Sequence, residues 1–122
     1  MTDLGSSVIF EVMKEEIEAG KHESLRKIKG VVEFRITENG KEQAVWTIDI
    51  RSFPGKVFEG SVSKGTKVNA AVHVSDENFI KICLGELEPV QAFMSSKVKV
   101  KGDILMMQKL NTVMRGVRKS VL

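Results

Sequence analysis

Apolar residues near the start of the chain recur at the spacing of an α-helix. In residues 6–20, SSVIFEVMKEEIEAG, apolar side chains fall on one face and most charged side chains fall on the other. Gly20 follows as a residue type that commonly ends helices. The pattern predicts an amphipathic N-terminal helix, and residues 21–30, KHESLRKIKG, predict a short second helix. The apolar face of the first helix is formed by Ile9, Val12, Met13 and Ile17.

Further along, apolar and polar residues alternate with the period of two that is typical of β-strands. Residues 32–37 and 44–51 show this alternation, and an Asn-Gly pair between them tolerates the positive φ angles of a tight hairpin turn. Residues 55–62 and 66–74 predict a third and a fourth strand, after a Phe-Pro-Gly break. We expect these four strands to form an antiparallel sheet with one strongly apolar face.

Two short helices, a fifth strand and a long final helix complete the predicted order of elements. Ser75-Asp76 offers an N-cap for the first short helix, and Pro89 suits the first turn of the second. In residues 97–101, KVKVK, the valines of a strand point inward and the lysines outward, and Asp103 then caps the final helix. The order predicts an α+β fold, in which helices cover one face of a five-stranded, mostly antiparallel sheet.

The composition is that of a globular protein. The 122 residues are 42% hydrophobic and 29% charged, which predicts one folded domain spanning residues 1–122. The single cysteine, Cys83, excludes an internal disulfide and fits a reducing compartment. The chain has no signal-peptide pattern and no stretch that approaches the about 20 apolar residues of a membrane span. We therefore expect a soluble, intracellular monomer.

No catalytic or cofactor-binding motif is recognisable in the sequence. The two histidines, His22 and His73, lack the spacing of metal ligands, and His73 alternates outward on its strand, so both are expected to be solvated. Cys83 lies on the apolar face of its predicted helix, where a small buried side chain is expected and a nucleophile is the alternative. We expect no enzyme activity, no metal and no cofactor.

The formal charge of +3 comes from 19 basic and 16 acidic residues, which is too small to require a nucleic-acid partner. The basic residues also lack the interleaved aromatic side chains on which bases stack, so no nucleic-acid binding is expected. A basic group near the C-terminus has two interpretations: a solvated surface, or a surface that docks on anionic lipid or on the phosphates of an acyl-CoA. This group consists of Lys97, Lys99, Lys101 and Arg115.

The final predicted helix, residues 103–122, carries more apolar residues than one contact with a sheet requires. The helix is either wedged between the sheet and another helix, or it lines a cavity for an apolar ligand, for which the adaptable methionine side chain is well suited. Gln108 is either simply exposed or a polar anchor at the end of a pocket. The main stripe consists of Met106, Leu110, Val113 and Val117, and the residues that widen it are Ile104, Leu105, Met107 and Met114.

Residues 76–110, DENFIKICLGELEPVQAFMSSKVKVKGDILMMQKL, resemble the signature of the sterol carrier protein type 2 domain family. The hairpin strand with AVWTIDI is similar to that family as well, so the resemblance covers nearly the whole chain. It implies an apolar tunnel between the sheet and the helices that binds a long-chain fatty acid, a fatty acyl-CoA or a sterol. The family's glutamine near the ligand falls on Gln108.

The resemblance also implies a set of tunnel residues and shows two departures from the family pattern. This chain has Ser96 where the family commonly has glycine, and Val90 followed by Gln91 where some relatives place a glutamine directly after the proline. The residues expected to line the tunnel are Trp46, Ile48, Val72, Phe79, Cys83, Phe93, Met94, Leu105, Met106, Gln108 and Leu110.

The function that the resemblance implies is lipid binding and transfer, with transient contact with an anionic membrane surface. One alternative is a scaffold module that presents lipid within a larger enzyme or membrane protein without transferring it. A second alternative is a thioesterase-like enzyme. The chain ends in Ser120-Val121-Leu122, and because relatives often end in a Ser-Lys-Leu-like peroxisomal signal, a peroxisomal address stands beside a cytoplasmic one.

Overall fold

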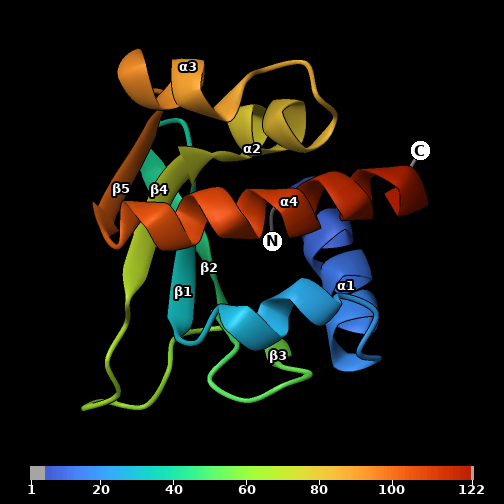
Figure 1. Ribbon diagram of the computed structural model, residues 1–122. Coiled ribbons are helices and arrows are strands. Elements are labelled where there is room, and N and C mark those ends of the chain that lie inside the picture. The colour runs from blue at the N-terminus through green and yellow to red at the C-terminus, as the bar shows by residue number, and fades with distance from the viewer. Residues whose placement is uncertain (1–4, 122) are drawn as a thin grey trace.

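The computed structural model describes the backbone of residues 5–121 and the side chains of residues 5–115. It contains a five-stranded sheet with helices on one face, which is the α+β architecture expected from the sequence (Figure 1). Val117 of the predicted stripe and the side chains of the C-terminal tripeptide lie outside the described side chains. Within the described part of the chain, no helix is both long enough and apolar enough to cross a membrane.

The strands lie in the order β3-β2-β1-β4-β5. Three of the four pairings are antiparallel, but β1 and β4 are parallel, so the expectation of four antiparallel strands is wrong at this pair. The reason is the connection at residues 60–69, which carries the chain from β3 at one edge across the sheet and starts β4 beside the start of β1. The strands are β1 (Val31–Glu38), β2 (Lys41–Asp49), β3 (Lys56–Glu59), β4 (Ala70–Ser75) and β5 (Val98–Gly102).

Three of the helices, α2, α3 and α4, begin at the residues that local signals predict. The side-chain oxygen of Ser75 accepts a hydrogen bond from the backbone N–H of Asn78 at 3.1 Å, and Asp103 accepts one from the N–H of Met106 at 3.0 Å. Pro89 occupies the first turn of its helix, where its missing N–H costs nothing. The helices are α1 (Gly5–Glu18), the 3-10 helix η1 (Glu23–Lys27), α2 (Asp76–Cys83), α3 (Pro89–Met94) and α4 (Ile104–Val121).

Alternation along the strands gives the sheet one helix-covered face and one uncovered face. On the covered face, Phe34 of β1 lies between Trp46 of β2 and Val72 of β4. On the uncovered face, Arg35 of β1 pairs with Glu33 and with Glu42, whose carboxylate lies 2.9 Å from the guanidinium. Apolar residues therefore meet the helices, while charged residues cross-link neighbouring positions on the opposite face.

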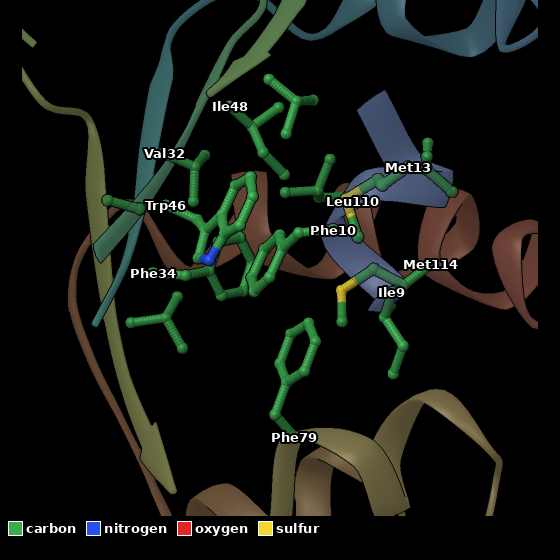
Figure 2. Packing of buried hydrophobic residues seen from close by; sticks show 14 of the residues in the cluster. Ile9, Phe10, Met13, Val32, Phe34, Trp46, Ile48, Phe79, Leu110 and Met114 are labelled. Carbon is green, nitrogen blue, oxygen red and sulfur yellow. The ribbon is translucent and has the colours of Figure 1, made fainter. Parts of the chain in front are cut away.

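Aromatic side chains fill the centre of the covered face (Figure 2). The ring of Phe10 on α1 stacks on Trp46 and on Phe79 of α2, with centroid distances of 4.9 and 4.7 Å. Phe34 meets Phe10 edge to face at 5.5 Å. These offset and edge-to-face contacts are favourable arrangements for aromatic pairs, and they fix α1 and α2 above the middle of the sheet.

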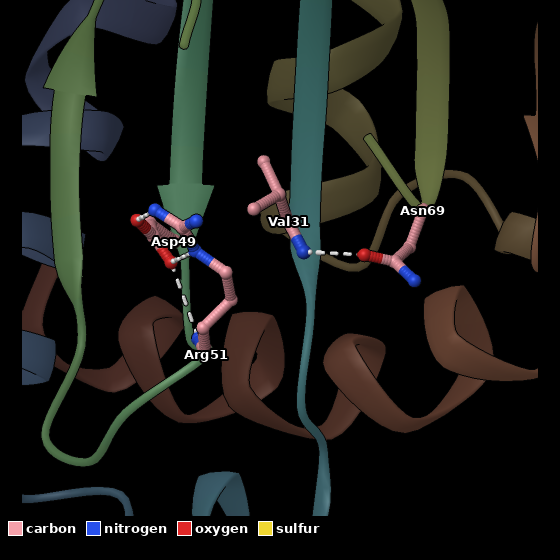
Figure 3. A network of polar contacts seen from close by, with 4 residues as sticks. All are labelled: Val31, Asp49, Arg51 and Asn69. Atoms are coloured by element: carbon pink, nitrogen blue, oxygen red, sulfur yellow. Dashed lines mark hydrogen bonds and ion pairs between the residues drawn. The ribbon is translucent and has the colours of Figure 1, made fainter. Parts of the chain in front are cut away.

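The joint between β5 and α4 depends on a close backbone approach. Gly102 has a φ of 102°, and a Cβ atom at this position would collide with the carbonyl oxygen of Asn69. The next residue, Asp103, donates its N–H to that carbonyl at 2.9 Å. The side-chain oxygen of Asn69 also accepts the N–H of Val31 at 2.9 Å, which ties the start of β4 to the start of β1 (Figure 3). Glycine at 102 therefore places the first turn of α4 against the sheet.

Candidate functional site

A cavity of about 280 Å³ lies between the β1, β4 and β5 part of the sheet and the helices α2, α3 and α4. Its volume is close to the lower end of the about 300–1,000 Å³ that small-molecule sites occupy. The sheet contributes Phe34, Val72, Val74, Val98 and Val100. The helices α2 and α3 contribute Phe79, Ile82, Pro89, Val90 and Phe93. The helix α4 contributes Ile104, Met107, Gln108, Asn111 and Met114.

The cavity wall is almost entirely apolar. Among its lining residues, Gln108 and Asn111 are the polar ones, and both come from α4. They are three residues apart, so the helical period places them on one side of α4. The cavity thus pairs a long apolar surface with two amide side chains at one wall, an arrangement that suits a ligand with an apolar body and a polar end.

The helix α4 has two apolar surfaces, which adjoin at Met107 and Met114 and explain its composition. Met106, Leu110 and Val113 are buried in the core formed with α1, α2 and the sheet. Ile104 and Met107 belong instead to the surface that lines the cavity. Both interpretations of the helix offered by the sequence therefore describe part of it, since one surface is wedged into the core and the other faces a cavity.

The residues predicted to line a tunnel fall into three groups. The cavity is lined by Val72, Phe79, Phe93 and Gln108. The buried core, outside the cavity wall, contains Trp46, Ile48, Cys83, Met106 and Leu110. Largely exposed positions next to the cavity are occupied by Met94 and Leu105. Ligand contact by any of them stays a prediction.

Sequence reasoning missed several lining residues for which a signal exists. The alternation of β4 and β5 and their pairing place three more valines on the same face as Val72: Val74, Val98 and Val100. Asn111 follows from the helical spacing that starts at Gln108. Trp46 lies on the covered face and stacks on Phe10, outside the cavity wall, so its contact with a ligand stays a prediction.

The cysteine and the two histidines lie in three different environments. Burial raises the pKa of the Cys83 thiol to about 12, which favours the protonated thiol and the small buried side chain expected from the sequence. His73 lies on the uncovered face beside Lys99, as its outward alternation predicted. His22 differs from the expectation of a solvated side chain, because it is half-buried and its Nε2 lies 2.9 Å from a carboxylate oxygen of Glu16. No cluster of potential metal ligands occurs among residues whose placement is described.

The basic residues proposed for docking lie around the cavity rather than in its wall. Lys97 is exposed at the turn before β5, and Lys99 and Lys101 point to the uncovered face of this edge strand. Arg115 is exposed one turn beyond Asn111, on the side of α4 that faces the cavity. Their docking role stays a prediction.

Comparisons with known proteins place this fold in a family. A model of the SCP-2 sterol transfer family matches residues 10–115. "Non-specific lipid-transfer protein-like 1" of Caenorhabditis elegans is 38% identical over 111 residues, which cover 89% of this chain and 89% of that protein. "Peroxisomal multifunctional enzyme type 2" of Mus musculus is 32% identical over 117 residues, which cover 96% of this chain and 16% of that enzyme. The chain also spans between 19% and 25% of several other curated relatives.

Solved structures show the same fold. The apo form of sterol carrier protein 2 from Yarrowia lipolytica has a TM-score of 0.80 at 22% identity, with 97% of this chain and 96% of that chain covered. Sterol carrier protein-2 from Aedes aegypti, in complex with palmitate, has a TM-score of 0.61 at 23% identity and covers 84% of this chain and 94% of its own. Since the family model matches residues 10–115 of the 122, the chain belongs to the SCP-2 sterol transfer family.

Proposed function

We propose that this protein binds the apolar chain of a lipid in the cavity between its sheet and α4, and carries the lipid between membranes. The observation that carries the proposal is the second surface of α4, where Ile104 and Met107 line a cavity. An apolar wall of this kind gains about 0.8 kcal/mol for each CH₂ group that it removes from water, before the costs of association.

The proposed ligands are long-chain fatty acids, fatty acyl-CoAs and sterols. The polar end of such a ligand would lie beside Gln108 and Asn111, since these are the polar residues of the wall. The complex of the Aedes aegypti relative with palmitate supports a fatty acid as the first ligand to test. The exposed Arg115 beyond Asn111 would attract the negative charge of a carboxylate or of CoA phosphates.

Ligand binding is proposed to order the helices around the cavity. Apolar wall that stays in contact with water in a cavity of about 280 Å³ is unfavourable, and covering it is worth about 0.8 kcal/mol for each CH₂ group removed from water. An empty cavity of this size is therefore expected to close partly or to loosen α4, and a bound chain is expected to reverse this. The free energy of unfolding should rise when the ligand binds.

The experiment that tests the binding proposal uses delipidated protein with palmitate, palmitoyl-CoA and cholesterol. Native mass spectrometry would detect a one-to-one complex, and thermal unfolding would show a Tm increase of about 10 °C at a ligand concentration 100 times the Kd. A protein that forms no complex and keeps the same Tm with all three lipids would contradict the proposal.

The rival interpretation is a module that presents lipid without transferring it. The mouse relative supports it, because the corresponding residues are a small part of a much longer enzyme. Transfer of a fluorescent fatty acid between donor and acceptor vesicles separates the two, since a presenting module binds the lipid but does not accelerate its exchange. Palmitoyl-CoA recovered intact after incubation would support a carrier, whereas loss of the thioester would favour the thioesterase interpretation.

Two further features belong to the same proposal. Residues 1–122 are proposed to form one lipid-binding domain, monomeric in its free form. A peroxisomal location is supported by relatives from Mus musculus and Dictyostelium discoideum that are named peroxisomal multifunctional enzymes.

A further inference from the structure

Exposed apolar side chains are concentrated at one edge of the molecule. Six large apolar residues are exposed among the described side chains, and five of them lie on α3 and the first turn of α4. Together with β5, which connects the two segments, they lie along the left edge of the molecule in Figure 1. We call this surface the mouth edge, and its apolar residues are Val90, Phe93, Met94, Ile104 and Leu105.

The mouth edge is continuous with the cavity. Three residues of the cavity wall are also exposed to solvent: Val90, Phe93 and Ile104. The cavity therefore reaches the surface between α3 and α4. Met94 and Leu105 lie just outside, with 79% and 67% of their surface exposed. Burying side chains of this size in water-free surroundings is favourable, and nothing in the fold of the described residues covers them.

Basic residues border this surface at β5, where Lys97 is exposed and Lys99 and Lys101 point to the uncovered face. Residues 89–115 contain five of the 19 basic residues of the chain and one of its 16 acidic residues. That acid, Asp103, is the cap of α4 and points its carboxylate at the N–H of Met106. Lys97, Lys99 and Lys101 lie between the two apolar segments, and none of them forms an ion pair with another described residue. Because β5 is an edge strand, these long side chains can extend around the edge.

We propose that the mouth edge docks on a bilayer that contains anionic lipid, with Met94 and Leu105 inserted among the headgroups and the cavity opening toward the membrane. The proposal rests on the proposed function, because it assigns the donor of the lipid that the cavity accepts. Separate apolar side chains interleaved with lysines match the boundary between headgroups and acyl chains. A second copy of this chain fits less well, since its mouth edge would bring three further lysines against Lys97, Lys99 and Lys101.

The test measures flotation of the protein with phosphatidylcholine vesicles, with and without phosphatidylserine as about a third of the lipid. Each basic residue near an anionic surface contributes about a factor of five to binding. The triple variant Lys97→Gln, Lys99→Gln, Lys101→Gln should therefore bind the anionic vesicles about a hundredfold more weakly. A matched triple variant with Lys21→Gln, Lys27→Gln and Lys41→Gln, at exposed positions away from the mouth edge, should bind as the wild type does.

A second pair of variants tests the apolar part of the surface. The double variant Met94→Ser, Leu105→Ser should lower binding to anionic vesicles by at least about tenfold. Val8→Ser is the matched control, because Val8 is 61% exposed but lies on α1. Equal losses in the control and in the double variant would overturn the proposal, since docking would then not use the mouth edge.

Palmitate binding is measured on the same samples, so that the two proposals fail separately. Wild-type protein that binds palmitate but does not float with anionic vesicles would overturn the docking proposal and leave lipid binding intact. Vesicle binding that depends on Met94 and Leu105 without palmitate uptake would support docking and overturn lipid binding. Sedimentation equilibrium tests whether a second copy of the chain binds this surface instead of a membrane. A wild-type dimer that dissociates in the Met94→Ser, Leu105→Ser variant would show that it does, and would overturn the docking proposal.

Discussion

Phe34 of β1 and Phe79 of α2 meet edge to face with their ring centroids 5.7 Å apart, and both rings line the cavity. Each ring also packs against Phe10 of α1, so the floor of the cavity is part of the aromatic core. Such a floor cannot move without disturbing the centre of the protein. A ligand larger than the present volume must therefore displace the other walls, which are α3, α4 and β5.

Filling the cavity from β5 should block ligand binding without unfolding the protein. Val100 is half-buried and faces the cavity, so the larger ring in Val100→Phe would occupy part of its volume. We expect palmitate to bind at least about tenfold more weakly, in a displacement assay with a fluorescent fatty acid. Val45→Phe is the control, because Val45 is half-buried on the uncovered face beside Arg35. Normal palmitate binding by Val100→Phe would show that the ligand lies elsewhere.

The amide of Gln108 should contribute to the binding of a ligand with a polar end. Gln108→Leu removes a hydrogen-bonding group from the cavity wall, and a hydrogen bond to a charged group is worth about 1.5–3 kcal/mol. We expect palmitate to bind at least about tenfold more weakly by calorimetry. Gln91→Leu, on the exposed side of α3, makes the same change outside the wall and should leave the affinity unchanged. Equal affinities for all three proteins would exclude Gln108 as a polar anchor.

The turn between α3 and β5 contains a residue in an unfavourable conformation. Ser96 has a φ of 62°, in the left-handed region where a side chain costs about 1–2 kcal/mol and glycine costs little. Ser96→Gly should raise the free energy of unfolding in urea by about 0.5 kcal/mol, after the greater freedom of glycine in the unfolded chain is subtracted. Ser95→Gly is the contrasting variant, because Ser95 has a φ of −92° and its hydroxyl donates to the carbonyl of Gln91 at 2.7 Å. That variant should lose stability.

The pair of Asp49 and Arg51 should make part of the stability depend on pH. The guanidinium of Arg51 donates two hydrogen bonds to the carboxylate, at 2.9 and 2.7 Å, and these hold the pKa of Asp49 below its ordinary value of 3.8 (Figure 3). Because the folded-state pKa is lowered, the pair stabilises the protein above about pH 4, and this contribution disappears as the pH falls through the lowered pKa.

The measurement for this pair is urea unfolding between pH 2 and pH 7. Asp49→Asn should be less stable than the wild type at pH 6, and the difference between the two should vanish toward pH 2. Glu59→Gln, at an exposed position on β3, serves as the control. A difference that stays constant over this range would mean that the charge of Asp49 does not contribute.

Local signals predicted most of the fold. The Asn-Gly turn, the caps at Ser75 and Asp103 and the alternation of the strands act within a few residues, so the sequence alone indicates them. The parallel pairing of β1 with β4 was not predicted, because it depends on the path of residues 60–69 and not on any pattern inside either strand. The contact of His22 with Glu16 likewise depends on the reversal of the chain after the end of α1.

The candidate site was predicted in outline and not in detail. The excess of apolar residues on α4 indicated two surfaces, and Gln108 does lie at the cavity wall. The identity of the wall residues depends on which part of the covered face α1 occupies. Since Phe10 stacks on Trp46, the β2 side of the sheet is filled, and the cavity lies over β4 and β5 instead. This choice is made by packing between distant elements, which helical and strand periodicities do not describe.

The two surfaces of α4 give this helix an unusual freedom to evolve. Changes at Leu110 or Val113 act on the core and should be tolerated as conservative replacements alone. Changes at Met107 or Asn111 act on the wall of the cavity, where under the proposed function a different shape would favour a different lipid. Neighbouring positions in one helix are thus under different constraints, one from folding and the other from the shape of the cavity. A new lipid preference could arise through the second set while the first set keeps the protein folded.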